Sequence, residues 1–160
     1  MSLTFRGRRV FIIMLLTLLL ATFFRDLVLL MCFFAISITL AVSYFEVLKA
    51  SRNLNKRTSL TPANIQLNLL SGESRDVKLE IKSDKRFELI TPFNFSKLNP
   101  TFIKPGLNEV WLTFEPLKSG LYVTNTLNVK VYDTLSLWRL NGNLDFKLTV
   151  KVYPKTYRAL

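Results

Sequence analysis

The sequence has 160 residues, which is enough for one domain of ordinary size and a short additional segment. It holds no histidine and a single cysteine, Cys32, which excludes imidazole catalysis, histidine-ligated metal sites and an internal disulfide. The net charge is +11, with eight Lys/Arg against two acids in residues 1–57 and fourteen against nine in residues 58–160. The densest basic clusters flank an apolar segment rather than mark a folded domain. We therefore expect the lipid bilayer, and no nucleic acid, as the partner of these charges.

An apolar segment fills the first third of the chain. Residues 10–24 are fifteen residues without a charge, Arg25-Asp26 follows, and residues 27–45 are nineteen more without a charge. A membrane-crossing helix needs about 20 apolar residues, so one continuous helix would be too long and would place the Arg-Asp pair near its middle. We predict a transmembrane helical hairpin over residues 10–48 with its turn at 25–26. Because the first run is short, a shallow re-entrant hairpin stays open as the alternative.

Basic residues crowd both outer ends of the predicted hairpin. They are Arg6, Arg8, Arg9, Lys49, Arg52, Lys56 and Arg57, whereas the turn holds Arg25 alone. Membrane proteins carry an excess of Lys/Arg on the cytoplasmic side, which places both ends in the cytoplasm. No small-residue cleavage site precedes Arg25, so we reject a signal peptide. We expect an integral protein of the cell membrane with two spans, a basic cytoplasmic start at residues 1–9, and a basic juxtamembrane linker at residues 49–57.

Four small polar residues lie in the predicted second span: Cys32, Ser37, Thr39 and Ser43. Hydroxyl groups at such positions either bond a neighbouring helix or, as we expect, the carbonyl groups of their own helix. We expect Cys32 to lie deep in the membrane as a small inert hydrophobe.

From residue 58 onward the sequence alternates with the two-residue period of β-strands. In the clearest run Leu144, Phe146, Leu148, Val150 and Val152 share one face, while Asp145, Lys147, Thr149 and Lys151 share the other. Shorter runs cover residues 65–69, 77–82, 110–114 and 127–131, and turn signals occur at 71–72, 83–85, 99–100, 104–106, 118–120 and 141–143. About seven strands with this spacing predict an all-β, immunoglobulin-like antiparallel sandwich over residues 58–160.

No catalytic group can be named in the predicted sandwich. Its acidic residues alternate with apolar ones or sit in turns, as solvated charges do, and its hydroxyls lack a histidine base. We therefore expect no enzyme, no metal and no cofactor. Trp111, Tyr132 and Tyr153 fall on the outward face of their strands. Exposed aromatic residues often anchor interfaces, so these three are candidate interface residues, with coverage of a neighbouring side chain as the alternative.

The order of these segments resembles a known family. A basic start, a two-span hairpin and a sandwich are followed by three motifs: Pro116-Leu-Lys-Ser-Gly120-Leu-Tyr122, a run from Val129 to Trp138 that contains Asp133, and Val150-Lys-Val152-Tyr153-Pro154. This resembles the N-terminal half of the domain of unknown function fifty-eight family, which is related to von Willebrand A proteins. Thr134 and Ser136 stand where that family usually has proline and glycine.

The resemblance implies a membrane-attached accessory protein paired with a MoxR-type AAA+ ATPase. Members of the family continue past the third motif into a von Willebrand A-like domain, so we expect either a fragment of such a protein or a short relative. Two functions follow as predictions. The favoured one is a non-catalytic, membrane-anchored interaction module that docks a cytoplasmic protein. The alternative is a small structural subunit of a larger integral membrane complex, packed against other membrane subunits.

Overall fold

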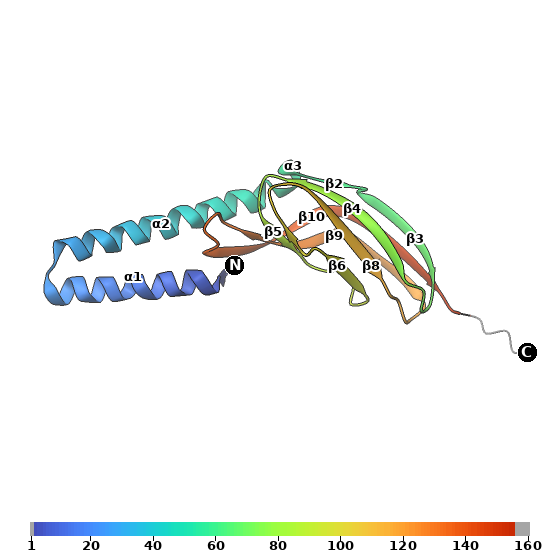
Figure 1. Ribbon diagram of the computed structural model, residues 1–160, viewed down its shortest axis with the longest axis horizontal. Coiled ribbons are helices and arrows are strands. Elements are labelled where there is room, and N and C mark those ends of the chain that lie inside the picture. The colour runs from blue at the N-terminus through green and yellow to red at the C-terminus, as the bar shows by residue number, and fades with distance from the viewer. Residues whose placement is uncertain (1, 156–160) are drawn as a thin grey trace, which may run out of the picture. The chain divides into compact units, whose positions relative to one another are not determined.

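The computed structural model describes residues 2–155 and divides them into two compact units (Figure 1). The first unit contains residues 2–52 and 131–141, and the second contains residues 53–130 and 142–155. The first is a pair of long helices with a short β element, and the second is a two-sheet β-sandwich. The predicted fold class, a helical hairpin followed by an immunoglobulin-like sandwich, is confirmed.

The helices of the first unit are α1 (Phe5–Phe24) and α2 (Leu27–Arg52), which pack side by side as a hairpin (Figure 1). The predicted turn at Arg25-Asp26 is present. Arg25 ends α1 in the left-handed conformation, with its backbone N–H donating to Ala21 O. Asp26 Oδ1 accepts the N–H of Val28 at 2.8 Å and so caps the start of α2. The charged pair therefore satisfies the amide groups that two adjoining helix ends leave free.

Both helices run further than the predicted bounds of 10–48. Helix α1 already includes Arg6, Arg8 and Arg9, and α2 continues through Lys49 to Arg52. Most of the stretch 49–57, predicted as a basic juxtamembrane linker, is helical: α2 ends at Arg52, and α3 (Leu54–Arg57) belongs to the second unit. Lysine and arginine are good helix formers, so α2 continues through Lys49 and Arg52 and ends only before Asn53, the N-cap residue of α3.

The first unit also contains a short β element that the sequence analysis did not predict. Strand β1 (Ser2–Leu3) pairs antiparallel with the start of β10 (Trp138–Tyr153), with Ser2 opposite Arg139 and Leu3 opposite Trp138. The turn that joins β9 (Gly120–Tyr132) to β10 is residues 133–137, called the β9–β10 turn below. A turn predicted at residues 141–143 is wrong, because these residues are extended within β10.

The position of the β9–β10 turn follows from one buried carboxylate. Asp133 is 1% exposed and accepts the N–H of Leu135 at 3.1 Å and that of Trp138 at 2.7 Å. Ser136 completes the turn with φ of 55°, the left-handed conformation that glycine favours. Side-chain bonds from aspartate to nearby backbone are a common way to make a turn. These bonds fix the turn at Asp133, and the Asn-Gly pair at residues 141–142, which favours a turn by sequence, remains extended.

The second unit is a sandwich of two sheets, visible as two layers of strands in Figure 1. One sheet has the order β2-β4-β8-β6, and the other contains β10, β9, β5 and β7, with β3 paired to β10. The remaining strand bounds are β2 Thr58–Thr61, β3 Asn64–Leu70, β4 Arg75–Ser83, β5 Phe87–Leu89, β6 Ser96–Asn99, β7 Phe102–Ile103 and β8 Gly106–Phe114. One pairing departs from the predicted antiparallel arrangement, because β3 lies parallel to β10.

The core lies between the sheets and is built from the alternating apolar positions. All five apolar residues of the Leu144–Val152 run are buried, and Lys147 and Lys151 are exposed, as predicted. The same holds for the buried faces of β4 and β8, which supply Leu79, Ile81, Val110, Leu112 and Phe114. On β9 the alternation shifts by one residue between Thr126 and Leu127, which is what a β-bulge produces.

Leu148→Ala should lower the free energy of unfolding by about 2–5 kcal/mol, because the side chain is fully buried and its loss leaves a cavity. Lys147→Ala, one residue away on the exposed face, is the matched control and should change it by less than about 0.5 kcal/mol. Urea unfolding of the full chain in mild detergent measures both. Equal losses would mean that the two faces of β10 are not distinguished as the structure has them.

Candidate interaction surfaces

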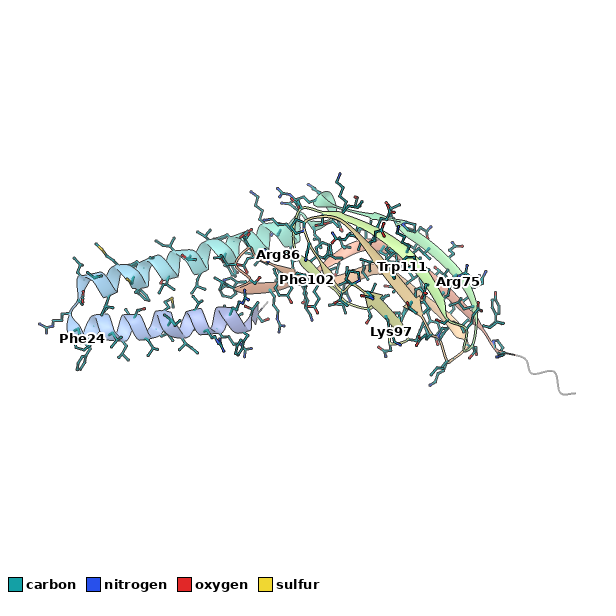
Figure 2. The ribbon with its side chains drawn as sticks, in the orientation of Figure 1. Phe24, Arg75, Arg86, Lys97, Phe102 and Trp111 are labelled. Carbon is teal, nitrogen blue, oxygen red and sulfur yellow. The ribbon has the colours of Figure 1, made fainter. Side chains whose placement is uncertain are left out.

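The apolar surface of α1 and α2 is the largest exposed feature of the first unit. Of the most apolar 18-residue stretch in each helix, only 11% is buried, so neither is the core helix of a globular domain. Figure 2 shows the side chains projecting along both helices. Both are long and apolar enough to cross a membrane. A contiguous apolar surface of this extent needs an apolar environment to cover it.

Two of the four small polar residues of α2 bond their own helix, as predicted. Ser37 Oγ donates to Phe33 O at 2.8 Å, and Thr39 Oγ1 donates to Ala35 O at 2.9 Å, each within the same helix. Ser37 also reaches Met14 Sδ on α1 at 3.3 Å. Cys32 is a free cysteine exposed on the surface of α2. These hydroxyls are therefore already satisfied inside the hairpin.

Five of the seven predicted membrane-interface bases lie at the open end of the hairpin. Arg6, Arg8 and Arg9 are exposed in the first turns of α1, and Lys49 and Arg52 lie in the last turn of α2. Cations at a helix N-terminus oppose the helix dipole, so the three arginines are not there to stabilise α1. The guanidinium of Arg9 lies 4.3 Å from the ring centroid of Phe5, back toward the helix start.

The other two predicted bases, Lys56 and Arg57, belong to α3 in the second unit. Arg57 donates to Asp84 Oδ2 at 3.0 Å, with both side chains about half exposed. Arg57 was predicted only as a membrane-interface residue, whereas the structure shows it paired with an acidic residue of the sandwich. An exposed pair of this kind contributes about 0–1 kcal/mol.

The three candidate aromatic residues do not form one surface. Trp111 is 47% exposed on the outer face of β8, labelled in Figure 2, directly opposite Lys78 on β4 and Asn99 on β6. Tyr153 is 51% exposed at the end of β10, on the outer face of the other sheet. Tyr132 is half-buried and belongs to the first unit. The alternation along each strand correctly identifies the side chains that point outward, but it does not show which sheet the strand belongs to. The three residues therefore share an orientation without sharing a surface.

The outer face around Trp111 is polar. Lys78 Nζ, from the neighbouring strand β4, donates to Glu109 Oε1 at 2.7 Å and lies 3.6 Å from Glu80. The hydrogen bond to Glu109, aided by the two nearby negative charges, raises the pKa of the exposed Lys78 ammonium above its usual value. Trp111 therefore stands alone among charges rather than within an apolar patch.

A surface that the sequence analysis missed is the first half of β9, Gly120–Thr126, called the β9 edge below. On one side β9 pairs with β10, and on the other with β5, which has only three residues. Ile90 N–H donates to Asn128 O at 2.9 Å and Glu88 pairs with Lys130 at 3.5 Å, so β5 lies beside the later part of β9. Within residues 2–155, no strand pairs with the β9 edge on that side.

The β9 edge is uncharged and partly apolar. Leu121 is 63% exposed and Val123 is 50% exposed, and Leu117 in the preceding loop is 83% exposed. Strand β3 is a second edge without charge, but its exposed side chains include the amides of Asn64, Gln66 and Asn68. Open edges normally carry a charge, a proline or a short length that prevents pairing with another chain. The β9 edge carries none of these guards between residues 120 and 126.

A shallow depression lies beside the β9 edge. It has a volume of about 500 Å³ and is lined in part by Phe95, Leu117, Lys118 and Tyr122. The Phe95 and Tyr122 rings meet edge to face with centroids 4.7 Å apart. No group of three or more His, Cys, Asp or Glu side chains in the described residues could hold a metal ion.

No protein-family model and no curated protein matches the sequence. Among solved structures, the SrpA adhesin from Streptococcus sanguinis is similar with a TM-score of 0.40 and 16% identity, over 62% of this chain and 58% of that chain. The Ig-like domain of human Obscurin-like protein 1 has a TM-score of 0.29 and 10% identity, over 64% and 91% of the two chains. A Bacteroides ovatus GH5 xyloglucanase has a TM-score of 0.39 and 13% identity, over 60% of this chain and 19% of that chain. At these TM-scores the likenesses carry no argument about function.

Changing Lys49, Arg52, Lys56 and Arg57 together to glutamine should leave part of the protein wrongly oriented in the membrane. Orientation depends on Lys/Arg within about 15–20 residues of the spans, and four of the seven flanking bases would be lost. The matched control changes four exposed lysines of the sandwich, Lys104, Lys118, Lys147 and Lys151, and should keep the native orientation. Protease added to intact cells measures the exposed fraction. Identical protection of both variants would contradict the membrane role of the four bases.

Proposed function

We propose that this protein is a non-catalytic, membrane-anchored interaction module. The hairpin of α1 and α2 crosses the membrane with both ends in the cytoplasm, and the sandwich presents the β9 edge to a cytoplasmic protein. The observation that carries the anchor is the exposed apolar surface of the two helices. In the most apolar 18-residue stretch of each helix, only 11% is buried. Helices suit this role because their backbone groups are satisfied without water.

The β9 edge supports the docking part of the proposal. An extended segment of a partner can add to an open sheet edge through backbone hydrogen bonds. The exposed Leu121 and Val123 would contact alternate side chains of that added strand, and Leu117 borders the depression beside it. We therefore propose an extended, mainly apolar segment of a protein as the partner, and the family resemblance names a MoxR-type AAA+ ATPase as the first candidate.

The alternative role, a small subunit of a larger integral complex, has less support. A subunit of that kind would use small polar residues to bond helices of other chains. Ser37 and Thr39 instead donate to carbonyl groups of their own helix. The features that favour a partner lie on the sandwich, where the β9 edge is open.

The proposed topology can be tested with single cysteines in a Cys32→Ala background. Phe24→Cys lies at the closed end of the hairpin (Figure 2), and Ser119→Cys lies in the exposed loop before β9. A membrane-impermeant maleimide should label Phe24→Cys on intact cells and Ser119→Cys only after the cells are opened. The reverse pattern would place the sandwich outside. Labelling of neither before opening would mean that the hairpin enters the membrane without crossing it.

Val123→Lys should abolish partner recovery from membranes in mild detergent, because a lysine on an open edge strand blocks pairing with another strand. Gln66→Lys, at an exposed position of the other uncharged edge, is the matched control and should retain the partner. The measurement is the amount of co-purified MoxR-type ATPase, or of whichever protein the unchanged chain recovers. Full recovery with Val123→Lys, or loss only with Gln66→Lys, would contradict docking at the β9 edge.

A further inference from the structure

The β9–β10 turn packs onto the side of α2 within the first unit. Trp138 Nε1 donates to the backbone Leu40 O at 3.0 Å, and the Trp138 ring meets Tyr44 edge to face with centroids 5.4 Å apart. Six residues beyond Leu40 on α2, Glu46 accepts the hydroxyl of Thr134 at 2.6 Å and its N–H at 3.3 Å. The turn therefore contacts α2 from Leu40 to Glu46 rather than only its last residues.

The same turn is held by the start of α1. Thr4 N–H donates to Leu137 O at 2.9 Å, and Thr4 Oγ1 donates to Ser136 O. Gly7 is buried against this contact, and a Cβ built there would overlap the carbonyl oxygen of Leu137. Only glycine permits so close an approach of the turn to the helix.

The contact with Leu40 lies inside the apolar length of α2. An exposed apolar stripe runs along the helix at the spacing of one face: Val28, Met31, Phe34, Ile38, Val42 and Phe45. Phe45 is 67% exposed and stands five residues beyond Leu40. At a rise of 1.5 Å per residue, this places the Trp138–Leu40 bond about 7.5 Å closer to the closed end of the hairpin than Phe45. If lipid covers the stripe as far as Phe45, it reaches the level of the β9–β10 turn.

Several polar groups of the turn are paired within the protein. The Asp133 carboxylate accepts two backbone N–H groups, Thr134 bonds Glu46, the Ser136 N–H donates to Asp133 O, and the Ser136 and Leu137 carbonyls accept from Thr4. Non-helical backbone is tolerated at membrane depth only when it is satisfied by protein. Leu135, at the tip, is apolar and 51% exposed. Tryptophan and tyrosine, here Trp138 and Tyr44, are the residues enriched at membrane interfaces.

We propose that the β9–β10 turn is a third membrane-contacting element, which lies in the lipid interface beside the hairpin with Leu135 and Trp138 against the acyl chains. This inference rests on the membrane anchoring proposed above and adds that a loop of the β-fold, not only the helices, contacts lipid. Because the turn binds α1 and α2 at once, it fixes how deep the open end of the hairpin lies.

The protein reports on this site through its own two tryptophans. Trp111→Phe leaves Trp138 as the only tryptophan, and Trp138→Phe leaves Trp111 as the control on the outer face of the sandwich. The full chain is reconstituted into liposomes whose phospholipid is brominated near the top of its acyl chains. Bromine quenches indole emission on contact, so Trp138 should lose most of its emission, and Trp111 should keep it. Iodide, which quenches from the aqueous phase, should instead reduce the emission of Trp111 and leave that of Trp138 largely unchanged.

An unquenched Trp138 would overturn the inference, whether iodide reaches it or a protein surface covers it. Flotation of the same liposomes after an alkaline wash separates this from failure of the anchor: a chain that floats but has an unquenched Trp138 is anchored without a lipid-bound turn. Gly7→Leu in the Trp111→Phe chain should displace the turn and restore the emission of Trp138. Ala41→Leu, on an exposed face of α2, should leave the quenching unchanged. Equal quenching in both variants would contradict the contact with α1 that holds the turn.

Discussion

The constraint on which the account depends is the apolar surface that the protein leaves uncovered on α1 and α2. The core of the sandwich is complete in itself, but the two helices expose rows of Phe, Leu, Ile, Val and Met side chains to their surroundings. In water such a surface would drive aggregation, whereas in lipid it needs no further partner. The other features of the first unit fit that environment. Its backbone is helical, its turn satisfies its own amides through Asp26, and its basic residues gather at the open end.

The sandwich has a different constraint: the outer strands of each sheet have an edge whose backbone groups are not paired with another strand. Most edges are short or polar: β7 has two residues, and β6 has four, including Lys97. The β9 edge is the exception in combining length, lack of charge and exposed apolar side chains. A domain surrounded by water would be expected to guard such an edge unless a partner covers it. This is why docking is assigned to the edge rather than to the scattered aromatic residues.

The sequence predicted those elements whose signals are local. The two-residue alternation of Leu144–Val152 and the uncharged runs around Arg25-Asp26 each depend only on neighbouring residues, and both were confirmed. The prediction of a turn near Asn141 was wrong. The Asp133 carboxylate accepts the backbone N–H groups of Leu135 and Trp138, and these bonds place the turn earlier in the chain. Strand β1 has only two residues, too few to show a period. The parallel pairing of β3, the open β9 edge and the docking of the β9–β10 turn on α2 join residues far apart in sequence, so no local pattern signals them.

The most direct test of the account uses the unmodified chain, because its single cysteine, Cys32, lies on the exposed surface of α2 near the closed end of the hairpin. If lipid covers this surface, Cys32 should not react with a membrane-impermeant maleimide applied to both sides of native membranes. It should react fully once the membranes are dissolved in a denaturing detergent. Rapid labelling of Cys32 in intact membranes would show that water reaches the helix surface. That result would contradict the membrane anchor and, with it, the function proposed for the protein.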